Sequence, residues 1–325
     1  MAEVHTPGNL AELQVPIWFW IGYHLIIAIF IAMDLVAGVR RKEMTLREAL
    51  RWVAVWVGIG TAFGIIIYSM TGNPEAVALY YAAYAVEYSL SMDNLFVFAV
   101  IFSYFSVPIP AQPIVLYVGI ITAIILRALF IYGGLWLIEQ YHWTIFIFGA
   151  VLIYSGYKLL KAGEVKVDPG RNPVVKAAKK ILPLADFYDG SKFIVRASGD
   201  GSKWLFTPMI LALAAIETTD LVFAFDSIPA VIAITLNFFI AYTSNISAIL
   251  GLRSLYFVIA LTMFRFKYVG QALSMILIFL GIKMILGGLE IVEVPTWISL
   301  MVVFSLLGGA ILLSIIRKEV KEVIE

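Results

Sequence analysis

Long apolar runs, separated by short polar stretches, are the main pattern of this chain. A helix needs about 20 apolar residues to cross a bilayer, because it rises about 1.5 Å per residue. No alternating ten-residue pattern indicates a barrel, so helices are the expected spanning elements. The runs of suitable length are residues 17–37, 49–70, 77–102, 113–136, 143–160, 206–232, 239–262, 268–289 and 296–316. The pattern predicts an all-α, polytopic membrane protein with about nine transmembrane helices.

Composition points to the same class. The 325 residues are 62% hydrophobic and 14% charged, whereas soluble domains are about 45–50% apolar and about 25% charged. Too few polar residues remain to cover a soluble surface, which excludes a soluble enzyme, a nucleic-acid-binding protein and a disordered protein. The absence of Cys excludes thiolate metal sites and Cys nucleophiles. The expected partner is the lipid bilayer, with no nucleic acid and no permanently bound cofactor.

The basic residues lie on alternate connections between the runs. If the runs alternate simply, Arg40, Lys179, Arg265 and Lys318 all fall on one side of the membrane, and the loops on the other side hold no Lys or Arg. Basic loops stay in the cytoplasm. The pattern therefore predicts an outside N-terminus and a cytoplasmic C-terminus.

Two three-helix stretches resemble each other, and their matching segments occur in the same order. Each stretch holds an odd number of helices, so the two copies would enter the membrane from opposite sides. Inverted repeats of this kind are typical of secondary transporters, whose sites lie between the halves. The matched segments are Ser89–Phe96 with Val222–Pro229, Leu126–Phe130 with Leu252–Tyr256, and Gly156–Leu160 with Gly281–Ile285.

This repeat divides the chain into five parts. They are two N-terminal helices (1–76), repeat A (77–160), a cytoplasmic loop (161–205), an inverted repeat B (206–289), and a last helix with its tail (290–325). In the loop, Lys192–Arg196 alternates in polarity and Ser198–Ser202 has turn composition, which favours a short hairpin. An ordered linker without chemistry is the favoured interpretation of this loop.

Ionisable residues interrupt the apolar runs, and each costs about 2.5–3.5 kcal/mol near a helix centre. Unless they pair or bind something, this cost is not recovered. For Arg127 and Arg253, structural ion pairs that hold helices together are the favoured interpretation, and a gating or counter-charge role is the alternative. The candidate metal ligands are Glu87, Asp93, Asn94, Glu217, Asp220, Asp226 and Ser227; the candidate counter-charges or gating residues are Arg127, Arg253 and Asp34. For Asp34, pairing with the nearby Arg40 and Arg41 is the favoured role.

The spacing of the acids bears on the shape of the helices. Glu87 and Asp93 are six residues apart, so a straight helix would turn them about 120° away from each other, and the second copy repeats this spacing. A helix break would let them converge. Pro229 and the weak helix segment Ser89–Asn94 are the expected places for a break.

The charges suggest a divalent ion. Four central acids (Glu87, Asp93, Asp220 and Asp226) carry −4 when ionised, and Arg127 and Arg253 would neutralise two of these charges, leaving −2. The ligands available are oxygens, which suit Mg²⁺, Ca²⁺ or Mn²⁺ better than zinc or copper. The predicted cargo is therefore a hard divalent cation.

Two acidic motifs, Glu87–Val97 and Glu217–Ala230, resemble those of the TerC/Alx family of integral membrane proteins. The stretches Leu250–Phe257 and Gly281–Met284 also fit, and the resemblance covers roughly residues 17–316. The family is named for tellurium resistance, its Alx-type members are associated with manganese export, and it is grouped with the LysE-like transporter superfamily. The resemblance implies a metal exporter, and we expect the plasma (inner) membrane of a prokaryote.

The leading hypothesis is a secondary transporter that exports Mn²⁺, with protons as the coupling ion. The alternative is a membrane scaffold or partner protein of a tellurite-resistance or stress complex, with loop 161–205 as its docking surface. An intramembrane enzyme is disfavoured, since the sequence offers no HExxH motif, no Cys and no evident Ser/His pair.

Overall fold

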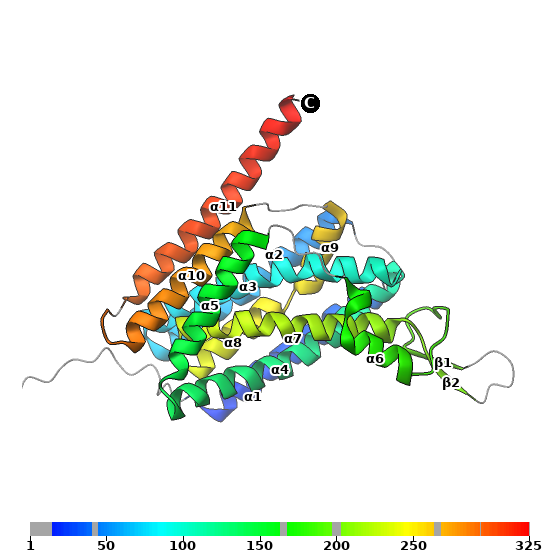
Figure 1. The fold of residues 1–325 in the computed structure, drawn as a ribbon, viewed down its shortest axis with the longest axis horizontal. Coiled ribbons are helices and arrows are strands. Elements are labelled where there is room, and N and C mark those ends of the chain that lie inside the picture. Colours follow the sequence, from blue (N-terminus) through cyan, green and yellow to red (C-terminus); the bar gives the residue numbers. More distant parts are fainter. Residues whose placement is uncertain are drawn as a thin grey trace, which may run out of the picture.

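The computed structural model describes residues 15–40, 45–162, 168–196, 203–262, 268–292 and 294–324. It is a helical bundle with one small β-hairpin (Figure 1), which confirms the predicted fold class. The long helices are α1 (Ile17–Arg40), α2 (Leu46–Thr71), α3 (Pro74–Tyr104), α4 (Gln112–Gln140), α5 (Thr144–Ala162), α7 (Met209–Ile234), α10 (Val269–Gly288) and α11 (Thr296–Ile324). The shorter elements are α6 (Pro173–Ile181), α8 (Phe238–Ile249), α9 (Leu252–Thr262), β1 (Ile194–Arg196) and β2 (Trp204–Phe206).

Every predicted apolar run contains helix. Among the described residues, seven helices are long and apolar enough to cross a membrane, and α8 with α9 gives an eighth span if the bent pair counts as one. Helix α7 has the necessary length, 26 residues, but carries Glu217, Asp220 and Asp226. The count of nine stays a prediction that depends on α7.

Local signals set the helix boundaries near the membrane surface. Thr45 caps α2 in a capping box with Glu48, and Gly72 ends that helix in the left-handed conformation. Asn73 then caps α3, with Pro74 at its first position. This tight connection makes α2 and α3 antiparallel neighbours.

The breaks that the sequence suggested for α3 and α7 are absent from the described structure. Both helices run without interruption, and Pro229 lies inside α7. The bent span is instead α8–α9, where the two helix axes differ by 41°. Gly251 occupies this bend with φ of +93°, and a Cβ built there would lie 2.6 Å from the side chain of Trp56. Glycine meets both requirements, because it alone tolerates this φ and this close contact.

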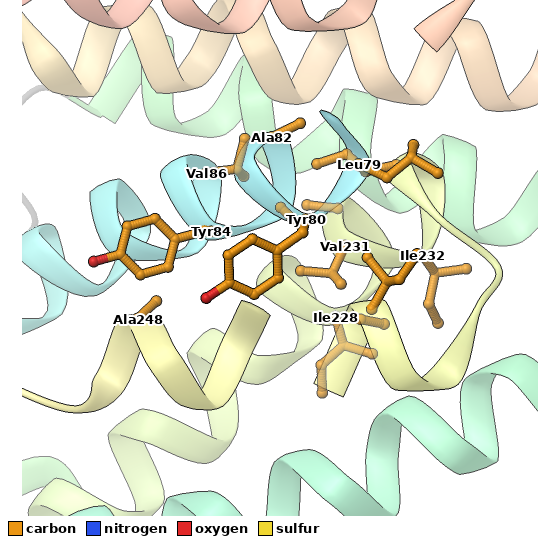
Figure 2. Packing of buried hydrophobic residues seen from close by; sticks show 14 of the residues in the cluster. Leu79, Tyr80, Ala82, Tyr84, Val86, Ile228, Val231, Ile232 and Ala248 are labelled. Atoms are coloured by element: carbon orange, nitrogen blue, oxygen red, sulfur yellow. The ribbon is translucent and has the colours of Figure 1, made fainter. Parts of the chain in front are cut away.

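Helix α8 lies at the centre of the bundle. All its residues from 239 to 249 are buried, and it packs on α3 and α4. Figure 2 shows part of the apolar cluster that joins α3, α7 and α8; its labelled members include Tyr80, Tyr84, Ile228, Val231 and Ala248. Polar groups of α8, and those of α3 and α4 that face it, are therefore shielded from both water and lipid.

Helices α5 and α10 form the closest helix pair. A Cβ built at Gly156 would lie 2.6 Å from the carbonyl oxygen of Ser274, and one built at Gly281 would lie 2.6 Å from that of Gly149. The offset of 125 residues that aligns Gly156 with Gly281 (281 − 156) also aligns Gly149 with Ser274 (274 − 149). The two contacts are thus equivalent under the repeat. They support the inverted repeat, which itself stays a prediction.

Replacing Gly281 with alanine is expected to lower the free energy of unfolding by about 1–3 kcal/mol, because the added methyl group meets backbone that cannot move aside. Thermal unfolding in detergent would measure the loss. Gly287→Ala is the matched control on the same helix, since no atom lies within 4 Å of the added Cβ. Equal stability of the two variants would contradict the close helix contact.

The described part of the segment between α5 and α7 contains a helix and a β-hairpin. β1 and β2 pair antiparallel, with Val195 opposite Leu205, which confirms the predicted hairpin; the predicted turn at 198–202 lies outside the described residues. Tyr188 donates to the carbonyl oxygen of Phe105 at 2.5 Å. The segment is thus attached to the connection between α3 and α4, as expected if both lie on the same side of the membrane.

Candidate functional site

A buried ion pair joins α3 and α4. Arg127 on α4 forms a salt bridge with Glu87 on α3, and neither side chain is more than 2% exposed. Arg127 also donates to the side-chain oxygen of Asn245 on α8, whose amide nitrogen donates to the second Glu87 oxygen at 3.1 Å. Ser91 donates to Glu87 Oε1 at 2.9 Å. We call these four residues the Glu87 cluster; its carboxylate is both neutralised and hydrogen-bonded.

Two acids of α7 lie near this cluster. Asp220 Oδ1 is 3.9 Å from Arg127 Nη2, and the Asp220 side chain is 15% exposed. Glu87 and Asp220, which the predicted repeat would make equivalent, therefore share one arginine. Glu217, three residues earlier, points its Oε1 toward Gly119 of α4, and this buried oxygen has no hydrogen-bond partner within the described residues.

A second buried ion pair lies apart from the first. The Asp34 carboxylate of α1 accepts two hydrogen bonds from Arg253 of α9, at 2.6 and 3.1 Å, and one from the Tyr117 hydroxyl of α4 at 2.6 Å. The side chains of the expected partners, Arg40 and Arg41, lie outside the described residues, within which Arg253 is the cation that binds Asp34. The reason is geometric, because α1 packs against the bundle and turns Asp34 inward, where it is 3% exposed.

The remaining candidates on α3 and α7 lie elsewhere. Asp226 accepts a hydrogen bond of 2.5 Å from Ser155 of α5. Asn94 and Ser227 are buried, and Ser227 Oγ has no hydrogen-bond partner within the described residues. The backbone of Asp93 is helical, while its side chain lies outside the described residues.

These positions change the predicted charge balance. Arg253 neutralises Asp34 and not a central acid, so of the two arginines in that sum only Arg127 contacts the central acids within the described residues. Within the described part of the chain, no three His, Asp or Glu side chains are close enough to hold a metal ion. The continuous helices explain this separation, because they turn Asp220 and Asp226 to different sides of α7.

Three polar partners escaped the sequence analysis: Asn245, Ser155 and Tyr117. Asn245 had a usable signal, since an amide in the middle of an apolar run is costly unless it has a partner. Ser155 and Tyr117 had none, because serine and tyrosine are ordinary in membrane helices. Only the fold places them beside acids that are 71 and 83 residues away in sequence.

Comparison with known proteins places the chain in a family. The sequence profile of the integral membrane protein TerC family matches residues 72–322. A relative from Escherichia coli (strain K12), whose name Alx carries the description of a proposed membrane-bound redox modulator, is 39% identical over 89% of this chain and 91% of its own length. A membrane protein of Myxococcus xanthus is 38% identical over 92% of both chains, and one of Rickettsia felis is 39% identical over 92% of this chain and 98% of its own.

No solved structure matches the chain. The match to the family profile nevertheless covers most of its length, including both acidic motifs and both buried arginines. The chain therefore belongs to the integral membrane protein TerC family.

Proposed function

We propose that this protein is a secondary transporter that exports a hard divalent cation from the cytoplasm, with Mn²⁺ as the first candidate and protons as the coupling ion. The observation that carries the proposal is the excess of acid on α7. Glu217, Asp220 and Asp226 lie on one helix, which the sequence predicts to span the membrane. The one arginine within 4 Å of any of them in the described structure already binds Glu87. Acids inside a membrane that lack a full counter-charge are typical of ion and proton pathways.

The donor chemistry favours the same class of cargo. Carboxylate, amide and hydroxyl oxygens surround the region, and the chain has no Cys. Oxygen ligands suit Mn²⁺, Ca²⁺ and Mg²⁺. The acids of α3 and α7 do not converge on one point in this conformation. Binding of one ion by both helices would therefore require α3 and α7 to move relative to each other, as alternating access requires.

Transport by purified protein in liposomes tests the proposal. We expect Mn²⁺ flux that increases with an opposing proton gradient, and a fall to the rate of empty liposomes in the Asp93→Asn/Asp226→Asn variant, because it loses one anionic candidate ligand from each of the two acidic motifs. Ca²⁺ and Mg²⁺ are measured in parallel. Glu139→Gln, at an exposed position near the end of α4, is the matched control.

Failure of well-folded protein to move any divalent cation would contradict the transporter proposal. The alternative is then a membrane scaffold or partner protein, with loop 161–205 as its docking surface. A redox role, which the name of the Alx relatives suggests, would need chemistry other than thiol exchange, because this chain has no Cys.

A further inference from the structure

Helix α6 presents two apolar sides. Val175 is completely buried, and the helix packs against α7. A second apolar stripe stays exposed in the described structure: Val174 is 46% and Ile181 is 77% exposed, and Ala177 lies between them on the same side. A short helix that packs on a membrane helix and still exposes an apolar stripe resembles an interfacial helix.

The neighbouring hairpin shares this character. Ile194 and Trp204 are exposed, and the guanidinium of Arg196 lies 4.8 Å from the centre of the Trp204 ring. Trp204 precedes the first residue of α7 by five positions, so it is at most ~17 Å of chain from that helix. Tryptophan at this level is typical of the membrane–water interface.

The net charge of the segment between α5 and α7 indicates which kind of surface it can bind. Residues 168–196 and 203–206 contain seven basic and three acidic residues, which gives a net charge of +4 (7 − 3). A second copy of the same segment would be repelled, whereas an anionic lipid surface would attract it. The basic residues are Arg171, Lys176, Lys179, Lys180, Lys192, Arg196 and Lys203.

We propose that α6 and the β1–β2 hairpin lie on the anionic phospholipid headgroups that surround the bundle, with Val174, Ile181 and Trp204 inserted among the lipids and the lysines of α6 at headgroup level. Helix α6 reaches this position because the segment is fixed to the bundle by the bond from Tyr188 to Phe105. The proposal needs only the membrane fold and does not depend on the transported ion.

The lack of Cys makes a direct test simple, since one introduced cysteine gives one labelled site in the full-length protein. Ile181→Cys and Lys176→Cys are each spin-labelled and placed in nanodiscs that contain either phosphatidylcholine alone or phosphatidylcholine with phosphatidylglycerol. Collisions with oxygen, which enters lipid, are compared with collisions with a water-soluble nickel chelate. In anionic discs we expect the label at 181 to meet oxygen and the label at 176 to meet nickel.

Removing basic charge should release the segment. In the Ile181→Cys background, Lys176→Gln/Lys180→Gln is expected to lower the ratio of docked to undocked segment about 30-fold. Each of the two lysines near an anionic surface contributes a factor of about 5, and the two factors multiply. Discs of phosphatidylcholine alone should show the same release with both lysines present, so the test does not depend on the folding of that variant.

Several results would overturn the proposal. One is a label at 181 that is as accessible to nickel as the label at 176 in anionic discs. Another is protection of residue 181 that is the same in both kinds of disc. If the label at 181 is protected from the nickel chelate only when two copies share a disc, the exposed apolar stripe of α6 would be a contact between copies instead.

Discussion

Replacing Asp34 with asparagine is expected to lower the free energy of unfolding by about 3–5 kcal/mol. The change leaves the guanidinium of Arg253, which is 2% exposed, without a negative partner. The cost of an uncompensated buried charge greatly exceeds that of a lost hydrogen bond. Denaturant or thermal unfolding in detergent would measure it.

The double variant Asp34→Leu/Arg253→Met separates charge from packing. Replacement of both partners with apolar residues of similar size removes the buried charges together, so most of the stability should return. Tyr117→Phe removes only one hydrogen bond to the carboxylate and should cost about 1.5–3 kcal/mol. A double variant as unstable as Asp34→Asn would mean that this pair stabilises the fold through something other than charge neutralisation.

Replacing Glu87 with glutamine is expected to cost about 3–5 kcal/mol, whereas Asp220→Asn should cost only about 1 kcal/mol. Glu87 is the direct partner of Arg127 and is completely buried. Asp220 is 3.9 Å away and partly exposed, and without it Arg127 still binds Glu87. Parallel unfolding measurements on the two variants give the comparison.

This difference separates a structural acid from one that is available for a ligand. If the transporter proposal holds, Asp220→Asn should keep its stability and lose Mn²⁺ flux, because Asp220 is not required to neutralise Arg127. Equal destabilisation by both substitutions would instead make Asp220 a structural partner of the arginine.

Much of the fold could be predicted because a bilayer restricts the choices. Apolar runs such as 77–102 and 113–136 have few alternatives to a helix, since backbone groups in lipid must be satisfied internally. The bend between α8 and α9 was missed because its cause lies elsewhere in the chain. Gly251 is required there by the close approach of Trp56 from α2, and no local pattern records that contact.

The candidate site was predicted in its residue types but not in its pairings. Glu87, Arg127 and Arg253 stand out in the sequence because charge is costly in a membrane. Which acid meets which arginine depends on how the helices pack. Arg253 could have met a central acid; instead α1 supplies Asp34 to it.

The complete burial of α8 has a consequence for how the protein is made. A helix of 12 residues with no lipid-facing side gains little from entering the bilayer alone. Its main partners, α3 and α4, precede it in the chain, so they are already synthesised when α8 emerges. The earlier helices can therefore pack together before α8 is added between them. A truncation after residue 250 should retain more native packing than a chain from which α3 is deleted.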